Sequence, residues 1–309
     1  MRARFVLAIA LMSKLGRYVV GRHLGTGGMG VVYDGVSPDG EHVAIKILRR
    51  DRCADPRAVR RFHDEALVGR IVHHPHLVSV IDEAEACGVP YLVMRPVPGE
   101  PLGVSIRRDG TPSFAGAISL VMQTLDALGA IHDAGIVHGD VKSDNVLVDR
   151  FSTATVIDLG LARVDLWTGE PVAEPGVEVV SGTPEYMAPE VGRGCAPSTR
   201  SDLYSVGVIL YELLTGTTPF AGGTSSEVLR RHTADTVVPP SLRCPEREMP
   251  QILERITLHA LNKHPGQRFA NAHAFMSALA IAARSCTDER PGAPPQVFSS
   301  EATTLEQPI

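Results

Sequence analysis

Cysteine is scarce in this chain of 309 residues: there are five, at positions 53, 87, 195, 244 and 286. The number is odd and no two of them form a CxxC pair, which argues against a disulfide framework and against a cysteine-ligated metal site. Reduced thiols are typical of a reducing compartment. We therefore expect free cysteines, no structural metal and a cytoplasmic location.

A strong charge of either sign is also missing. The 30 basic and 35 acidic side chains leave a formal net charge of −5, which is too small to indicate binding to nucleic acid or to an anionic membrane. Hydrophobic residues make up 44% of the chain and charged residues 21%, as in ordinary soluble proteins. We expect neither nucleic acid nor a membrane among its partners.

No apolar run reaches the roughly 18 to 20 residues that a membrane-spanning helix needs. The first twelve residues, MRARFVLAIALM, imitate the start of a signal peptide, but no cleavage pattern follows them. A second methionine, Met12, stands shortly before the first expected strand. We interpret residues 1–11 as an over-extended start or a floppy extension.

Two parts of different character follow an N-terminal extension that covers residues 1–17. Residues 18–97 contain strand patterns such as EHVAIKIL, with one helical stretch between them. Residues 98–284 carry long helical patterns, and the helix expected in RSDLYSVGVILYELLTG is apolar enough to be buried. Residues 285–309 lack a core pattern and are expected to be disordered. The sequence predicts an α+β protein with a small β-rich lobe, a larger α-helical lobe and a tail.

Local signals place a helix and a turn in the β-rich lobe. Asp55 is a suitable N-cap and is followed by proline, which suits the first helical position. Glu65 and Gly69 lie on one face of this helix, and their apolar neighbours indicate that the face is covered. In HLVSVIDEAEACGVPYLVMRPV we expect two strands joined by a turn around Gly88-Val89-Pro90.

A glycine-rich segment, GTGGMGVV, lies between two expected strands. Gly25, Gly27 and Gly30 allow backbone N–H groups to come close to phosphates. A dinucleotide-binding fold would require a helix directly after such a segment, whereas the strand sequence VVYDGV follows here. The pattern favours a hairpin that lies over phosphates, although a lone GxGxxG is more often only a tight turn.

Lys46, in the strand sequence VAIK, is flanked by apolar residues on both sides. A lone lysine in a strand usually stays exposed, but this one shares its face with Ala44 and points beneath the glycine-rich segment. Glu65, on the following helix, is the candidate counter-charge. Its alternative interpretation is a solvated residue on an exposed helix face.

The octet HGDVKSDN carries an acid, a cation and an amide close together. Asp140 can accept a proton from an attacking hydroxyl, and Lys142 can neutralise charge on a phosphoryl group in transfer. Asn145 can bind Mg²⁺ through its side-chain oxygen, and Asp158, at the end of the strand ATVIDLG, can supply a carboxylate to the same ion. The alternative for such an octet alone is a solvated turn.

The motifs GTGGMGVV, VAIK, HGDVKSDN, DLG, GTPEYMAPE and SDLYSVG, with Glu65 in its place among them, resemble the signature set of protein kinases. The resemblance covers residues 18–283. The segments GGMG, HHPHLV and LLTGTTPF resemble bacterial serine/threonine kinases of the eukaryotic-like (Hanks) type. The resemblance implies a bilobal protein-kinase fold that uses ATP with Mg²⁺, or Mn²⁺ in its place, to phosphorylate proteins.

The resemblance also implies a role for each matching residue. Lys46 would hold the α- and β-phosphates and pair with Glu65. Asp140 would be the catalytic base, and Lys142 would steady the γ-phosphate. Asn145 and Asp158 would bind the metal. The nucleotide would be surrounded by Leu24, Gly25, Gly27, Gly30, Val32, Ala44, Met94 as gatekeeper, the backbone of Arg95 and Val97, and Leu147.

Three further residues acquire structural roles through the resemblance. Glu190, at the end of GTPEYMAPE, would pair with Arg268 and hold the activation segment. Asp202, in the buried helix, would anchor the catalytic loop, which is the octet HGDVKSDN (residues 138–145).

Two other functions share part of this pattern. Kinases of small molecules such as aminoglycosides or choline often carry HGD where protein kinases carry HRD. The segment GTPEYMAPE favours a protein kinase, because it is where a protein kinase seats its peptide, and Lys142 with Thr183 is the serine/threonine pattern. A pseudokinase or nucleotide-binding scaffold is the other alternative, but such proteins commonly lose residues equivalent to Lys46, Asp140 or Asp158. We expect protein substrates and, as a source of signals, a soluble regulator.

Several positions depart from the family pattern. Gly139 replaces an arginine that usually receives a phosphate on the activation loop, and only Thr168, Ser181 and Thr183 offer hydroxyls there. The chain is therefore expected to be active without that phosphate, unless Arg163 supplies the missing cation. Leu159 replaces the phenylalanine of DFG, and because it is also apolar we expect this replacement to have no effect on function. Gly69 is expected to leave a gap and to loosen its helix by about 1 kcal/mol relative to alanine.

Overall fold

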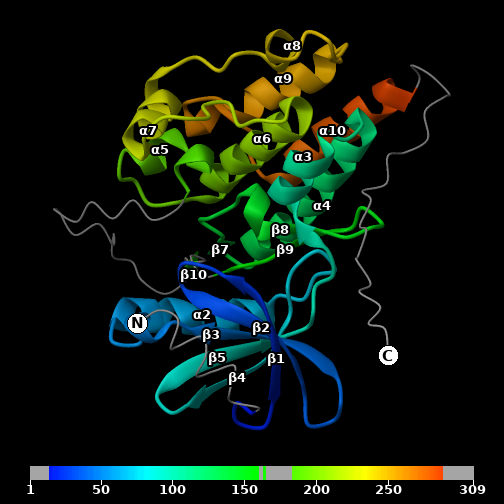
Figure 1. Cartoon of the computed structure of the whole chain (residues 1–309). Helices are drawn as coiled ribbons and strands as arrows, with labels where there is room; N and C mark the ends of the chain where they lie inside the picture. The colour runs from blue at the N-terminus through cyan, green and yellow to red at the C-terminus, as the bar shows by residue number, and fades with distance from the viewer. Residues whose placement is uncertain (1–13, 160–162, 165–182, 288–309) are drawn as a thin grey trace.

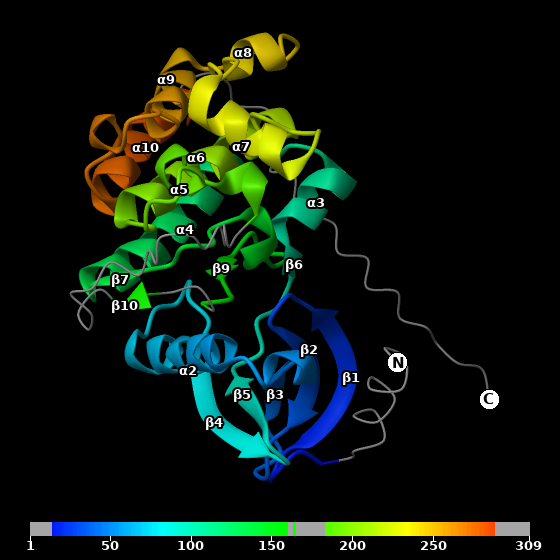
Figure 2. The ribbon, with the colours of Figure 1, turned by 90° about the vertical axis from the view of Figure 1, so that its left-hand side faces the viewer.

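The computed structural model describes residues 14–159, 163–164 and 183–287, which form two lobes (Figure 1). The first lobe is a five-stranded sheet with one long helix against it, and the second is mainly helical (Figure 2). The predicted two-lobed α+β architecture is confirmed. The elements of the first lobe are β1 (Val19–Thr26), β2 (Gly30–Val36), β3 (His42–Leu48), a 3₁₀ turn (Arg50–Arg52), α2 (Pro56–Ile71), β4 (Val80–Ala86) and β5 (Val89–Met94).

The sheet of the first lobe is antiparallel throughout, with the strand order β1-β2-β3-β5-β4. Side chains alternate along β3 as the sequence predicts. Val43, Ile45 and Ile47 pack into a core on one face of the sheet. Leu48 packs on the opposite face, in the core that contains α2 and continues into the second lobe. Lys46 lies on this second face and is therefore directed toward α2.

The turn between β4 and β5 is tighter than the sequence suggested. It consists of Cys87 and Gly88, with φ values of 52° and 74°, as in the two-residue hairpin turn that requires positive φ at both positions. Val89 and Pro90, which were expected in the turn, already belong to β5 and pair with β4. The expectation placed the turn too late because a cysteine at positive φ carries no sequence signal.

Helix α2 begins where its capping residues predict. The side chain of Asp55 accepts a hydrogen bond from the N–H of Arg57, and Pro56 occupies the first helical position. Phe62, Glu65 and Gly69 are buried on one face, so the prediction of a covered face is confirmed.

The expected gap at Gly69 is wrong. A Cβ atom added to this glycine would lie 2.5 Å from Cγ2 of Val80, which is closer than real Cβ contacts come. The side chain of Val80, at the start of β4, occupies the space that a larger side chain at position 69 of α2 would fill. Glycine therefore lets α2 and β4 approach each other.

The second lobe surrounds two apolar helices, α4 (Phe114–Asp133) and α6 (Thr199–Thr215). Helix α4 has the length and composition of a membrane-spanning helix, but 56% of its most apolar window is buried within the fold, where it packs against α6 and α10. The other elements are β6 (Glu100–Pro101), α3 (Leu102–Asp109), β7 (Ile136–Val137), a 3₁₀ turn (Ser143–Asn145), β8 (Val146–Val148), β9 (Ala154–Val156), β10 (Arg163–Val164), a 3₁₀ turn (Pro184–Tyr186), α5 (Pro189–Gly192), α7 (Ser225–Ala234), α8 (Pro240–Arg243), α9 (Gln251–Ala260), a 3₁₀ turn (Pro265–Gln267) and α10 (Ala272–Thr287).

Some expectations concern residues outside the described part of the chain. These are the extension of residues 1–11 with Met12, the hydroxyls of Thr168 and Ser181, and the tail beyond residue 287. Helix α10 runs through Ser285, where the sequence predicts the tail to begin. The four described cysteines, at positions 53, 87, 195 and 244, are free, as predicted.

Replacing Gly69 by alanine tests the close packing of α2 on β4. Because the new methyl group collides with Val80, Gly69→Ala should lower the free energy of unfolding by about 1–3 kcal/mol, measured by urea denaturation. The control is Gly129→Ala in α4, where the added Cβ has its nearest neighbour at 3.6 Å and should leave stability unchanged or raise it by up to about 1 kcal/mol. Equal stability of the two variants would contradict the close approach.

Candidate active site

Lys46 lies at the meeting point of three segments. Its Nζ donates to both carboxylate oxygens of Glu65, at 2.7 and 2.8 Å, and to Oδ1 of Asp158, at 2.8 Å. The side chains of Lys46 and Glu65 are 8% and 2% exposed, whereas that of Asp158 is 39% exposed. The predicted pairing of Lys46 with Glu65 is confirmed. The lysine therefore joins β3, α2 and the segment after β9, with its open side toward Asp158.

The opposite charges of Lys46 and Asp158 each favour the ionised form of the other. Burial alone would lower the pKa of Lys46, but the carboxylates of Glu65 and Asp158 outweigh it and raise that pKa above its ordinary value. Burial likewise opposes ionisation of Asp158, yet Lys46 holds the pKa of Asp158 below its ordinary value. The lysine is consequently a fixed cation at neutral pH, and Asp158 is an anion.

The glycine-rich hairpin between β1 and β2 lies beside this cluster, because Val32 of β2 pairs with Lys46 of β3. Its tip is closed by a hydrogen bond of 2.9 Å from the N–H of Gly27 to the carbonyl of Gly30. A Cβ added to Gly30 would lie 2.8 Å from the carbonyl oxygen of Ile47, whereas one added to Gly25 meets nothing within 4 Å. Packing on β3 thus explains Gly30, while Gly25 leaves space that a phosphate can approach.

The candidate adenine-binding residues line the junction of the two lobes. Met94 ends β5, is buried, and pairs with Ala44 of β3. The N–H of Arg95 donates to the carbonyl of Ser79 at 3.0 Å, so its own carbonyl is the group left for a ligand. No hydrogen bond found among the described residues uses the N–H of Val97. The side chains predicted to sandwich adenine, Val32, Ala44 and Leu147, are each partly accessible to solvent, and Leu24, also predicted to surround the nucleotide, is exposed.

The catalytic loop brings its three predicted residues together. Nζ of Lys142 donates to Oδ2 of Asp140 at 2.6 Å. The amide nitrogen of Asn145 donates to the backbone carbonyl of Asp140 at 2.9 Å and to its Oδ2 at 3.2 Å. These bonds fix the orientation of the Asn145 amide and leave its Oδ1 without a hydrogen bond within the described structure.

Asn145 and Asp158 fit the predicted metal site. The free Oδ1 of Asn145 and the half-exposed carboxylate of Asp158 are hard oxygen donors of the kind that Mg²⁺ takes from proteins. Asp158 has a φ of +63°, which is uncommon for a residue other than glycine and is often found where function holds the backbone in a strained conformation. Within the described ranges no cluster of three or more His, Cys, Asp or Glu side chains could hold a metal ion by itself. A metal ion held by these two residues would need further ligands from outside the described protein groups.

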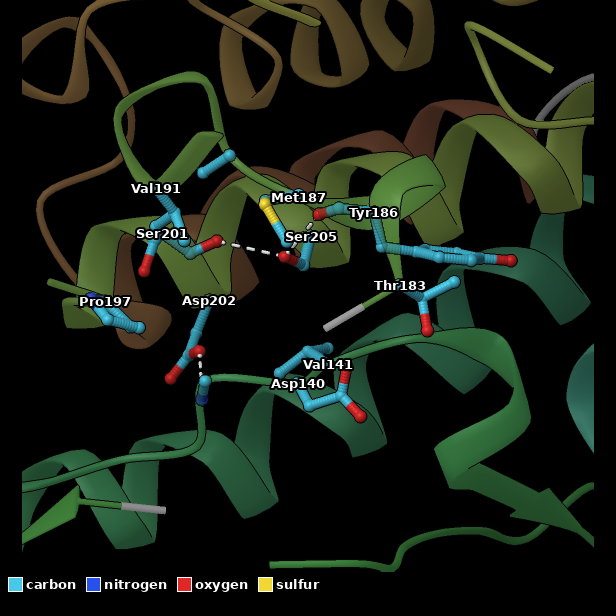
Figure 3. A pocket seen from close by; sticks show the side chains of 12 residues that line it. Asp140, Val141, Thr183, Tyr186, Met187, Val191, Pro197, Ser201, Asp202 and Ser205 are labelled. Atoms are coloured by element: carbon cyan, nitrogen blue, oxygen red, sulfur yellow. Dashed lines mark hydrogen bonds between the residues drawn. The ribbon is translucent and has the colours of Figure 1, made fainter. Parts of the chain in front are cut away.

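Asp202 of α6 holds the start of the catalytic loop, as predicted (Figure 3). Its Oδ2 accepts the N–H of His138 and its Oδ1 accepts the N–H of Gly139, both at 2.9 Å. Nε2 of His132 lies 2.9 Å from Oδ2. Gly139 has a φ of +77°, so the backbone conformation itself favours glycine where relatives of the resembled family carry arginine.

The segment that follows residue 182 is anchored by a second ion pair. Both guanidinium NH₂ groups of Arg268 donate to Glu190, at 2.7 Å each, and the arginine side chain is fully buried. Its remaining hydrogen bonds go to backbone carbonyls, including that of Asn262. The predicted pairing of Glu190 with Arg268 is confirmed. Bidentate geometry fixes the direction as well as the position of this segment.

A small cavity separates the catalytic loop from this segment. Asp140 lines one side and Thr183 the other, and Asp202 of α6 also lines it (Figure 3). Its volume of about 20 Å³ is enough for roughly one water molecule.

Three residues for which the sequence predicted no role are connected to this site in the structure. Ser143 of the catalytic loop, Tyr186 and Glu212 of α6 form a chain of hydrogen bonds. A signal for Glu212 was present, because it is an acid in an otherwise apolar helix that was predicted to be buried, and a buried carboxylate needs a partner. Ser143 and Tyr186 carried no such signal.

Comparison with known proteins agrees with the geometry. A family model described as "Protein kinase domain" matches residues 18–279. The kinase pkn3 of Myxococcus xanthus is 36% identical over 270 residues, covering 85% of this chain and 49% of the relative. Pkn1 of the same organism is 39% identical over 275 residues, covering 87% and 38%. PknB of Mycolicibacterium smegmatis is 36% identical over 296 residues, covering 94% and 46%. Each of the three is named a serine/threonine-protein kinase, and the chain spans about half of their length or less.

Substitution of Lys46 by methionine tests the role of the buried cation. Methionine keeps an apolar stem, and the neighbouring Glu65 can take up a proton instead of remaining an unpaired charge. We expect phosphoryl transfer from ATP to fall by about a hundredfold or more, while the circular dichroism spectrum stays unchanged. Near-normal turnover would refute the role assigned to Lys46. A matched control is Lys14→Met at an exposed lysine, which should keep full activity.

Proposed function

The chain belongs to the protein kinase family. From this premise we propose that it transfers the γ-phosphoryl group of ATP to serine or threonine hydroxyls of proteins, its own included. The observation that carries the proposal is the position of Lys46, which contacts Glu65 and Asp158 at the same time. In protein kinases the lysine–glutamate pair and the metal-binding aspartate must both be in place for transfer. The contacts of Lys46 with Glu65 and with Asp158 support the proposal that both are in place here.

The catalytic loop supplies the chemistry at the acceptor. Asp140 would accept a hydrogen bond from the acceptor hydroxyl and take up its proton as the oxygen attacks the γ-phosphorus. The new O–P bond forms while the bond to the β-phosphate oxygen breaks, and ADP leaves. Lys142, 2.6 Å from Oδ2 of Asp140, would stabilise the charge on the transferred group.

The family implies ATP and a divalent metal, and the residues present fit both. Asn145 and Asp158 would hold Mg²⁺, or Mn²⁺ in its place. When bound, the metal neutralises charge on the phosphates. Lys46 would hold the α- and β-phosphates beneath the hairpin of Gly25 and Gly27. We also propose a cytoplasmic location and a soluble regulator, on the composition of the chain.

The alternatives have weaker support. A kinase of small alcohols needs no platform for a peptide, whereas here the ion pair of Glu190 with Arg268 orders the segment next to Asp140. A nucleotide-binding scaffold has no need of Asp140 or Lys142, which are held in contact. The arrangement favours transfer to a protein.

Incubation with Mg-ATP and a mixture of casein and myelin basic protein tests the proposed function. Label from the γ-phosphate should appear in protein with the wild-type chain and fall by about a hundredfold or more with Asp158→Ala, because the metal loses a ligand. Asp39→Ala, at an exposed turn, is the control and should keep activity. Label that appears only in an added aminoglycoside or choline would show a small-molecule kinase, and no label in any acceptor would show a scaffold.

We also propose that the kinase is active without a phosphate on its activation segment. Gly139 offers no cation to a phosphate, and an added charge orders a loop only where cations receive it. The competing view has one structural support: β10 pairs Arg163 with Val137, two residues before Gly139. Phosphatase treatment, verified by mass spectrometry, should leave the initial rate on a protein substrate within about threefold.

A larger effect would contradict that expectation. A loss of more than about tenfold that autophosphorylation at Thr168, Ser181 or Thr183 restores would show that a phosphate is needed. In that case Arg163→Ala should remove the effect of the phosphate, because it would be the receiving cation.

A further inference from the structure

Three buried hydroxyl and carboxyl groups form a continuous chain across the candidate active site. Oγ of Ser143 lies 2.7 Å from the hydroxyl oxygen of Tyr186, and that hydroxyl donates to Oε2 of Glu212 at 2.7 Å. The three residues are 1%, 9% and 6% exposed. The one hydrogen of the Tyr186 hydroxyl is donated to Glu212, so in its bond with Ser143 the tyrosine oxygen accepts and Ser143 donates. Bonds that point the same way along a buried chain strengthen one another.

The three hydrogen-bonded residues belong to three different segments of the second lobe. Ser143 follows Lys142 directly and opens the 3₁₀ turn that ends at Asn145. Tyr186 lies in the segment that begins at Thr183, and Glu212 lies in α6. A shift of Ser143 would therefore move Lys142 and Asn145 with it, relative to the segment that would seat a peptide.

Helix α6 holds Tyr186 at both ends. Oγ of Ser205 donates to the backbone carbonyl of Tyr186 at 2.7 Å, and Glu212 accepts its hydroxyl. Ser205 and Glu212 are seven residues apart, about two helical turns, so they share one face of α6. Figure 3 shows Ser205 next to the backbone of Tyr186. Tyr186 is thus held in place by α6, and the hydrogen bond from Ser143 attaches the catalytic loop to this tyrosine.

Helix α3 provides room for the serine hydroxyl. A Cβ added to Gly103 would lie 2.6 Å from Oγ of Ser143, so any larger residue at 103 would displace that hydroxyl. This packing is independent of the hydrogen bonds and shows that the place of the hydroxyl is defined from two sides. Within the described ranges no cation forms an ion pair with Glu212, whose partner is Tyr186.

We propose that Ser143 is a positioning residue for protein substrates, acting through Tyr186 and Glu212 to set the catalytic loop against the segment that seats the peptide. The proposal rests on the function proposed above and adds to it the part of the loop that aligns the acceptor. The hydroxyl of Ser143 is buried against Tyr186, and Ser143 is not among the residues proposed to contact ATP or the acceptor hydroxyl. Its loss should therefore affect transfer to a protein and leave the handling of ATP alone.

Ser143→Ala separates these two effects. We expect kcat/KM for a protein substrate to fall about five- to thirtyfold, as for the loss of one buried hydrogen bond of 1–2 kcal/mol. KM for ATP and the slow hydrolysis of ATP without acceptor should change less than about twofold, since neither needs the peptide segment. Ser105→Ala, at another buried serine with 1% exposure on α3, is the matched control and should leave all three quantities unchanged.

A double-mutant cycle shows whether Ser143 acts through Tyr186. Tyr186→Phe removes both bonds of the chain, so adding Ser143→Ala to it should lower kcat/KM by less than about twofold more. Additive losses would overturn the proposal, as would equal losses in protein phosphorylation and in ATP hydrolysis, which would indicate a structural role only. Full activity of Ser143→Ala with an active wild type would overturn it while leaving the proposed function standing. A wild type that phosphorylates no protein would overturn both.

Discussion

The ion cluster of Lys46 is the interaction on which the arrangement of the two lobes depends. An ammonium group that is 8% exposed would lose much of its hydration free energy without partners, and removal of one partner of a buried ion pair typically costs several kcal/mol. Glu65 and Asp158 supply those partners from α2 and from the segment after β9. The position of α2 and the position of the candidate metal ligand are therefore set together, by one cation.

Helix α6 performs the corresponding task in the second lobe. Its buried part is mostly apolar but carries a polar row, in which Asp202 holds the start of the catalytic loop, while Ser205 and Glu212 hold Tyr186. A buried polar group is stable only with a partner, so each member of the row fixes one backbone segment. The catalytic loop and the segment that follows residue 182 are aligned because both are attached to the same rigid helix.

Residues whose role lies in their own chemistry could be predicted from the sequence. Lys46 with Glu65 followed from charged side chains in apolar surroundings. The roles of Asp202, Glu190 and Arg268 followed from the resemblance to protein kinases. Features that depend on how closely two elements approach could not be predicted. Gly69 was expected to leave a gap because the sequence does not show that Val80 fills it, and the hydroxyl of Ser143 gained a meaning only once Tyr186 was placed beside it.

The central claim is that this assembled site transfers phosphate to protein hydroxyls, and the nature of the phosphorylated product tests it most directly. The measurement is phosphoamino-acid analysis, confirmed by mass spectrometry of tryptic peptides, after reaction with Mg-ATP labelled in the γ-phosphate. The account predicts phosphoserine or phosphothreonine as the labelled product, and none when Asp140 is replaced by asparagine. Label confined to phosphotyrosine, to a small alcohol or to inorganic phosphate would contradict it.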